Sequence, residues 1–143
     1  MRKEDLVGVW RERGREIVRA GIAKADVPRA SQIMYTADGY MAVVNAPNGR
    51  KPVGETVARM DLDATTPAER AEAAIGVVAY AGRFEVEGDT VRHTLFTALN
   101  PNRVGDTQLR HVTLNGDDLT LAAPPDAQGN SFRIHWRRPA KVP

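Results

Sequence analysis

Alternation of apolar and polar residues with a period of two constrains this chain more than any other feature. A period of two is that of a strand with one face buried and the other in water. The pattern recurs in eight short segments: 6–18, 32–36, 40–45, 82–87, 90–99, 106–114, 119–123 and 131–138. Turn residues such as Ala37-Asp38-Gly39 and Asn115-Gly116-Asp117 join neighbouring segments as hairpins. The sequence therefore predicts eight antiparallel, up-and-down strands, and about eight strands close into a small barrel.

The two ends of the chain predict how such a barrel is closed. The first strand carries Trp10 near its start, and the last strand ends in Trp136-Arg137-Arg138. In a closed barrel the first and last strands are neighbours, so a guanidinium from the last strand can stack on the indole of the first. We expect Trp10 and Arg138 to seal one end of the barrel and to leave a pocket toward the other.

One helix interrupts the strands. Thr66-Pro67-Ala68-Glu69 is a capping box with proline at the first helical position, and an alanine-rich run follows it to about Tyr80, with Gly82 as the stop signal. The fold class is therefore an all-β, eight-stranded antiparallel barrel with one α-helix between the third and fourth strands. That helix would close an open barrel end or brace its side. The polar stretch 46–65 before it is either a binding loop or a plain connector.

Composition limits the function classes. The chain has 143 residues, enough for a single domain over 1–143, and its net charge is 20 − 18 = +2. This near balance argues against nucleic acid as a partner. The absence of cysteine excludes disulfides, thiolate metal sites and a cysteine nucleophile. With no apolar run of bilayer length and no leader-like segment at the start, we expect a cytoplasmic protein without a membrane partner.

Several motifs in a fixed order resemble a known family. They are Leu6-Val7-Gly8-x-Trp10, Tyr35-Thr36-x-Asp38-Gly39-Tyr40-Met41, Tyr80-Ala81-Gly82-Arg83-Phe84-Glu85-Val86-x-Gly88-Asp89-Thr90-Val91-x-His93, Asn100-Pro101-x-x-Val104-Gly105-x-x-Gln108-x-Arg110, Leu119-Thr120-Leu121 and Trp136-Arg137-Arg138. The chain resembles the lipocalin-like domain family of bacterial and fungal proteins over nearly its whole length. The resemblance implies a small calycin-type barrel, and function must then be argued from the pocket.

Sorting strand residues by face predicts an apolar interior interrupted by polar groups. The polar groups on inward faces are Glu12, Glu16, His93, Thr97, Gln108 and Arg110, joined by Tyr35. The predicted ligand-binding residues are Tyr35, Phe84, His93, Leu95, Thr97, Gln108 and Arg110. His111 and His135 fall on outward faces, so three histidines cannot converge on a metal, and we expect neither a metal nor a cofactor.

Three interpretations of this interior stay open. In the first, the polar groups only satisfy one another, with Glu12 bonding Arg110 and His93 taking a neighbour's hydroxyl. In the second, they orient a small, mostly apolar ligand with a polar or anionic end, with Arg110 gripping an oxygen. In the third, they catalyse a cofactor-independent isomerisation or cyclisation of a carbonyl compound.

The catalytic interpretation gives each ionisable group a chemical role. His93 would move a proton near neutral pH, burial would raise the pKa of Glu12 or Glu16 toward that of a useful base, and Arg110 would stabilise an enolate. A homodimer also stays open as an alternative to a monomer, because Phe96 and Val9 fall on outward faces.

Overall fold

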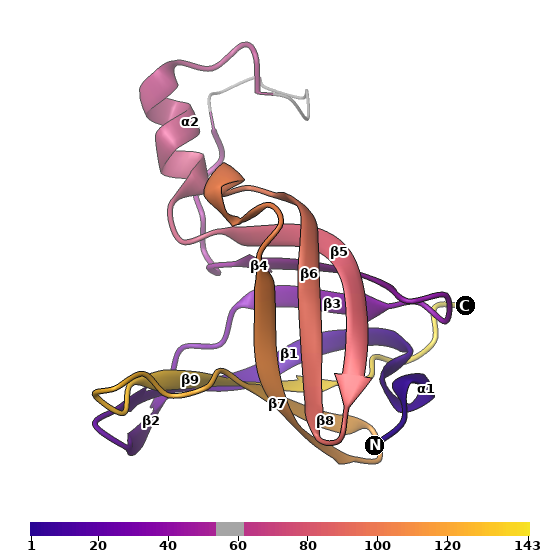
Figure 1. Ribbon diagram of the computed structural model, residues 1–143. Coiled ribbons are helices and arrows are strands. Elements are labelled where there is room, and N and C mark those ends of the chain that lie inside the picture. Colours follow the sequence, from indigo (N-terminus) through magenta and orange to yellow (C-terminus); the bar gives the residue numbers. More distant parts are fainter. Residues whose placement is uncertain (54–61) are drawn as a thin grey trace.

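The computed structural model describes residues 1–53 and 62–143, and its strands form one sheet that closes on itself (Figure 1). The strands found there are β1 (Gly8–Arg19), β2 (Ile22–Asp26), β3 (Ala30–Tyr35), β4 (Tyr40–Ala46), β5 (Val78–Glu87), β6 (Thr90–Ala98), β7 (Thr107–Asn115), β8 (Asp118–Ala122) and β9 (Ser131–Arg137). Each is antiparallel to its neighbour, and β1 pairs with β9 as well as with β3. Strands β1 and β3 to β9 thus make the predicted closed eight-stranded barrel.

Strand β2 is an addition that the period-two pattern does not predict. At 12 residues, β1 is long enough to pair with β3 through Gly8–Arg11 and with β2 through Arg15–Arg19. The turn Ala20-Gly21 has positive φ at both positions, which lets the chain reverse tightly. All five residues of β2 are exposed, so no buried face imposes an alternating pattern on them.

One end of the barrel is closed as the chain ends predict. The guanidinium carbon of Arg138 lies 3.9 Å from the ring centroid of Trp10. The same guanidinium donates to the carbonyl oxygens of Val7 at 2.8 Å and Asp5 at 2.9 Å, and the Trp10 indole donates to Leu6 O at 2.8 Å. Leu6, expected in the first strand, instead ends a short helix, α1 (Lys3–Leu6), whose last residue is fully buried under the barrel.

Helix α2 (Pro67–Ala74) begins at the predicted capping box, with Thr66 N donating to Glu69 Oε2 at 2.8 Å and Glu69 N donating to Thr66 Oγ1 at 3.2 Å. It lies between the third and fourth barrel strands but ends well before Tyr80, which belongs to β5. The expected stop signal was wrong: Gly76, with φ of +73°, follows the helix, and Gly82 lies inside β5.

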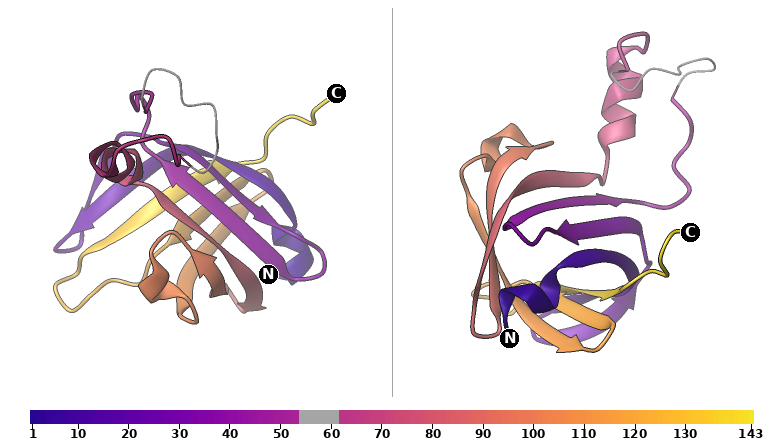
Figure 2. Two further views of the ribbon diagram at one scale, coloured as in Figure 1. Left: turned by 90° about the horizontal axis from the view of Figure 1, so that it is seen from above. Right: turned by 90° about the vertical axis from the view of Figure 1, so that its right-hand side faces the viewer.

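The helix stands away from the barrel. Views from above and from the side show α2 projecting beyond the sheet (Figure 2), and none of its residues is buried. Together with residues 47–53 and 62–66 and 75–77 it forms what we call the arm. Residues 54–61 of the stretch 46–65 lie outside the described part of the chain. Helix α2 therefore neither plugs the barrel nor braces its side.

Candidate functional site

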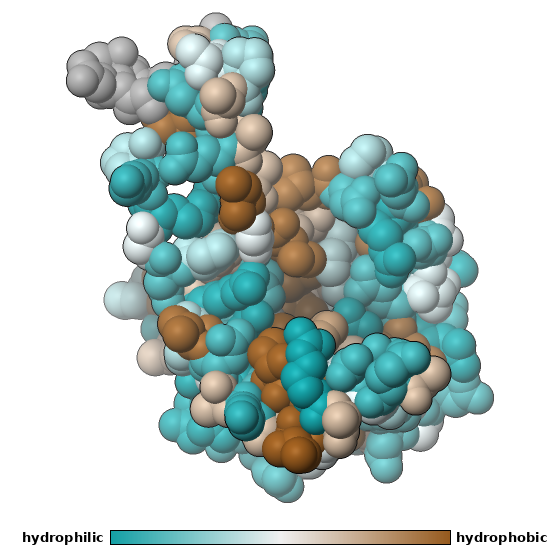
Figure 3. Space-filling view, turned by 90° about the vertical axis from the view of Figure 1, so that its left-hand side faces the viewer, coloured by the Kyte–Doolittle hydropathy of each residue, from teal (hydrophilic) through white to brown (hydrophobic). Residues whose placement is uncertain are grey.

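The barrel contains a cavity of about 250 Å³, and Figure 3 views the molecule from the side opposite α1. Seen from that side, apolar side chains gather in a recess beneath the arm (Figure 3). Strands from all round the barrel contribute the apolar lining, which comprises Ile17, Ile33, Val43, Val78, Tyr80, Leu121, Phe132, Ile134 and Trp136. Ligand sites are usually about 300–1,000 Å³, so this cavity suits a compact molecule.

Arg110 and Gln108 supply polar groups on one wall of the cavity. The guanidinium of Arg110 donates to its own strand neighbours, to Leu109 O at 2.7 Å and to Gln108 Oε1 at 2.8 Å, and it lies 5.2 Å from the ring centroid of Phe132. No carboxylate among the described residues forms an ion pair with Arg110. Burial lowers the pKa of Arg110, but a guanidinium stays protonated in proteins. The cavity wall therefore carries a positive charge that lacks an anionic partner.

His93 is held between two tyrosines. Its Nε2 lies 2.9 Å from the hydroxyl of Tyr35, and its Nδ1 lies 3.3 Å from the hydroxyl of Tyr80. Burial, with Arg110 nearby, lowers the pKa of His93 to about 3, and burial raises the pKa values of both tyrosines. The ring is neutral at physiological pH, so the expectation that His93 titrates near neutrality was wrong.

The neutral ring also fixes the direction of these hydrogen bonds. A neutral imidazole donates from one nitrogen and accepts at the other. Tyr35 is 2% exposed, and within the described chain its hydroxyl has His93 as its side-chain partner, so this hydroxyl is best satisfied by donating to Nε2. Nδ1 then donates to Tyr80, whose own O–H stays available to the cavity that Tyr80 lines.

Glu12 forms a buried ion pair, but not with Arg110. Its carboxylate accepts two hydrogen bonds from Arg15, at 2.7 and 2.8 Å, and one from the backbone N–H of Arg29 at 3.1 Å. Burial alone would raise the pKa of Glu12, but these hydrogen bonds outweigh it and the pKa lies below the ordinary value. The expected raised pKa was therefore wrong, and Glu12 is a weak base.

A bulge in β1 places Arg15 inside and Glu16 outside. The register with β9 shifts between Glu12 and Gly14, so one extra residue sits on β1 and the inward face changes from even to odd positions. Arg15 consequently lines the cavity. Glu16, expected to face inward, accepts no hydrogen bond from a cavity residue of the described chain; its Oε2 lies 2.9 Å from His135 Nε2 on the outer side.

The remaining expected ligand contacts fall in three places. Tyr35 and Phe84 are buried beneath the cavity, with ring centroids 4.7 Å apart, and neither is part of its lining. Leu95 is buried but lines a neighbouring depression beside η1 (Pro101–Arg103). Thr97 is exposed, because a second bulge, opposite Gly82, shifts the register of β6 and turns this side chain outward.

A family model described as a lipocalin-like domain matches residues 31–138 of this sequence. The chain belongs to the lipocalin-like domain family. None of the curated proteins matches this lipocalin-like chain in sequence.

The solved structures to which this chain is similar are distant from it in sequence. A lipocalin-like protein from Bacteroides uniformis is 14% identical, with a TM-score of 0.49 and with 94% of this chain and 98% of that chain covered. An uncharacterized protein from Bacteroides eggerthii is 12% identical, with a TM-score of 0.50 and with 94% and 99% covered. At this identity the likeness concerns the fold alone.

Among the described residues, three buried side-chain atoms of the lipocalin-like barrel lack a hydrogen-bond partner, and two of them belong to the cavity. Trp136 Nε1 and Asn45 Oδ1 are buried in residues that line the cavity, and neither has a hydrogen-bond partner in the described protein. Assigning alternate strand residues to inward and outward faces predicts that Trp136 points inward, but it cannot show that the indole N–H lacks an acceptor. Tyr80 was missed because it was assigned to the helix, and Arg15 because the bulge at Gly14 was not recognised.

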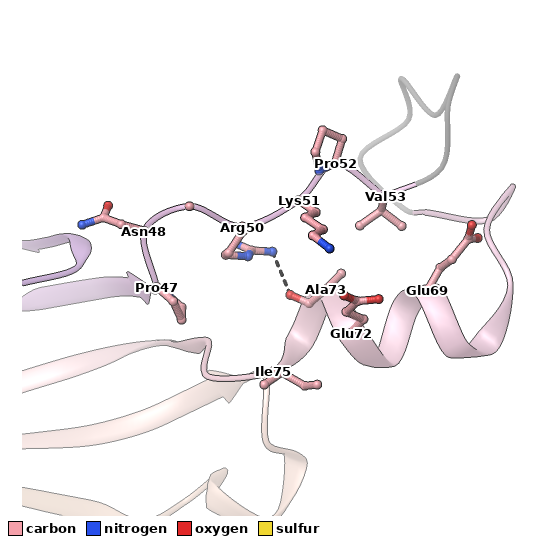
Figure 4. Close-up of a pocket in the computed structure, with 11 residues that line it drawn as sticks. Pro47, Asn48, Arg50, Lys51, Pro52, Val53, Glu69, Glu72, Ala73 and Ile75 are labelled. Atoms are coloured by element: carbon pink, nitrogen blue, oxygen red, sulfur yellow. Dashed lines mark hydrogen bonds between the residues drawn. The ribbon is translucent and has the colours of Figure 1, made fainter. Parts of the chain in front are cut away.

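The arm forms a second hollow, between residues 47–53 and α2 (Figure 4). This groove is about 540 Å³, and Arg50 Nη2 crosses it to donate to Ala73 O at 2.7 Å. Its walls carry charges of both signs, from Lys51, Glu69 and Glu72. Because it is open to solvent and offers no buried polar group, the lipocalin-like cavity is the better candidate site.

Two further classes of feature are absent from the part of the chain that the structure describes. Residues 1–53 and 62–143 contain no group of three or more histidine or acidic side chains placed to hold a metal ion. The same residues include no helix long and apolar enough to cross a membrane.

Proposed function

We propose that this protein binds a compact, mostly apolar molecule with an anionic end, most simply a carboxylate, inside the barrel. The observation that carries the proposal is the guanidinium of Arg110 on the cavity wall, which forms no ion pair with any carboxylate of the described residues. A buried charge without a counter-charge is costly, so an anionic ligand there removes a penalty as well as adding hydrogen bonds.

The neighbouring groups favour the same chemistry. Arg15 and Arg29 also line the cavity, while the acidic side chain beside them, Glu12, is occupied by Arg15. The O–H of Tyr80 is a further donor at this wall. An anion therefore meets donors and positive charge, and an ammonium group would meet repulsion.

The acid–base chemistry of an isomerase or cyclase has weaker support. A histidine with a pKa of about 3 is a poor base, and its two nitrogens already contact Tyr35 and Tyr80. Glu12 is held ionised by Arg15. We therefore base the proposal on binding.

Titration calorimetry with 2-naphthoate and its neutral counterpart 2-naphthamide tests this proposal. We expect the carboxylate to bind more tightly than the amide, and Arg110→Gln to weaken carboxylate binding by about 10- to 100-fold, the range for a hydrogen bond to a charged group. The amide should lose little.

Arg11→Gln is the matched control. Arg11 is exposed on the outer face of β1, where its Nε contacts Gln32 Oε1 at 3.4 Å. Equal losses in the Arg110 and Arg11 variants, or equal affinities of carboxylate and amide for the unmodified protein, would contradict an anion site at Arg110.

A further inference from the structure

Trp136 carries a buried hydrogen-bond donor that the barrel does not use. The side chain is 2% exposed, and its Nε1 has no acceptor among the described residues. The other tryptophan behaves in the ordinary way, since Trp10 Nε1 donates to Leu6 O at 2.8 Å. Buried donors are nearly always paired with an acceptor, so the free indole N–H of Trp136 needs an explanation.

The two cross-strand neighbours of Trp136 do not provide an acceptor for its indole N–H. Its cross-strand neighbour on β1 is Glu12, whose carboxylate is engaged by Arg15 and by the Arg29 backbone. The neighbour on β8 is the apolar Leu119. An indole N–H can only donate, and a tightly packed ring cannot turn to find another partner. Asn45, the other unsatisfied residue of the lining, has a rotatable amide and is less restricted.

Trp136 and Arg110 lie toward opposite ends of the cavity. Trp136 is two residues before Arg138, which closes the barrel against Trp10. The Arg110 guanidinium instead reaches back along β7 to Gln108, a residue that also lines the depression beside η1 at the open end. A compact acid held by Arg110 therefore directs its apolar body toward Trp136.

We propose that the ligand carries a second oxygen, a hydroxyl, ether or ketone, at the end remote from its carboxylate, and that Trp136 Nε1–H donates to this oxygen. This inference rests on the proposed binding function and narrows its ligand class from apolar acids to oxygenated apolar acids. A hydrocarbon end would leave the indole N–H unsatisfied in a closed space, which is how buried polar groups discriminate against ligands that lack their partner.

Matched naphthoates test the inference. The probes are 2-naphthoate and its derivatives with a hydroxyl or methoxy group at the 5-, 6- or 7-position; methoxy retains the acceptor and removes the donor. We expect at least one position at which both substituents tighten binding by about 5- to 10-fold, as one satisfied hydrogen bond allows. In Trp136→Phe this advantage, taken as the ratio of the affinities of the substituted and unsubstituted probes for the same variant, should fall to within about 2-fold.

A spectroscopic readout keeps the test decisive if Trp136→Phe does not fold. The chain contains two tryptophans, so ¹⁵N-labelled protein gives two indole N–H signals. The favoured oxygenated probe should move the Trp136 signal downfield, 2-naphthoate should move it less, and the Trp10 signal should stay in place as the internal control.

The outcomes separate the two proposals. If 2-naphthoate does not bind, or binds without dependence on Arg110, the proposed function fails and this inference fails with it. If 2-naphthoate binds through Arg110 but no substituent adds affinity, or the Trp136 signal responds equally to all probes, the inference alone is overturned. An equal response would mean that a single carboxylate reaches both groups.

Discussion

At the scale of single residues, His93 shows how burial decides chemistry. The ring lies among Tyr35, Tyr80 and the charge of Arg110, so its protonated form is disfavoured in the folded protein. An unfolded chain has no such restriction and takes up the proton near the ordinary pKa of about 6.5. Stability contributed by neutral His93 is therefore complete above pH 6.5 and is lost as the pH falls toward 3.

This linkage predicts a pH effect on unfolding. Between pH 7 and pH 5 the free energy of unfolding should fall by about 2 kcal/mol from His93 alone, because the unfolded state binds the extra proton. Urea unfolding at the two pH values measures this loss, and His93→Gln should reduce it by about that amount. His111→Gln, at an exposed position of β7, should retain the full loss; an unchanged loss in His93→Gln would contradict a depressed pKa.

At the scale of elements, two bulges decide which side chains enter the cavity. The alternating pattern predicts correctly that Trp10 and Glu12 on β1 and His93 on β6 point inward. Beyond the bulge in each of these strands the prediction fails. A bulge adds one residue and so exchanges the two faces. The glycines at 14 and 82 are the signals that were available, since glycine inside a strand marks a bulge or a close backbone approach.

Gly82, opposite the bulge of β6, predicts a strong effect of substitution. A Cβ at this position would collide with the backbone oxygen of Thr94, and a backbone atom cannot move aside as a flexible side chain can. We expect Gly82→Ala to destabilise the protein by about 2–4 kcal/mol, in the range of severe overpacking. It should also weaken 2-naphthoate binding, because β6 carries His93.

Gly14→Ala provides the comparison for this prediction. A Cβ at Gly14 has no atom within 4 Å, and the residue, like Gly82, lies at a register shift. Thermal and urea unfolding should place this variant within about 0.5 kcal/mol of the unmodified protein, as is usual for a substitution that meets nothing. Similar losses in the two variants would mean that glycine flexibility, and not the contact with Thr94, sets the requirement at Gly82.

At the scale of the whole molecule, closure depends on residues from the two ends of the chain. The Arg138 guanidinium stacks on Trp10 and donates to the carbonyls of Val7 and Asp5, so it joins β9 to the segment before β1. We expect Arg138→Ala to lower the free energy of unfolding by about 2–4 kcal/mol, the sum of one stacked cation and its hydrogen bonds to the backbone.

Arg137→Ala, one residue away, is the matched control. Its side chain is exposed and pairs with Asp118 at 2.9 Å on the surface, an arrangement that contributes about 1 kcal/mol at most. Urea unfolding of both variants measures the difference. Arg138→Lys should not restore stability, because a lysine ammonium cannot stack flat on the indole while bonding two carbonyls. Full rescue by lysine would show that charge alone is required.

The fold was more predictable than the site. Strand number, closure through Trp10 and Arg138, and the capping box of α2 all follow from short-range signals: alternation, turn residues and cap chemistry. The cavity depends on which face each residue takes after a bulge and on which polar atoms find partners, and both are properties of the folded structure. His93 was found because it precedes the bulge in β6, and Gln108 and Arg110 because the pairings of β7 show no register shift. Trp136 needed the three-dimensional packing to reveal that its N–H lacks an acceptor among the described residues.

Residues close to the two chain ends, Asp5 and Arg138, are in contact at the sealed base, and this contact has a practical consequence. Since Arg138 donates to the backbone of Asp5 and Val7 there, a fusion partner or a surface linker joined to either terminus would be attached near the base and not at the recess of Figure 3. Immobilised by either end, the barrel would hold its opening outward, an orientation suited to a biosensor for the acids it captures.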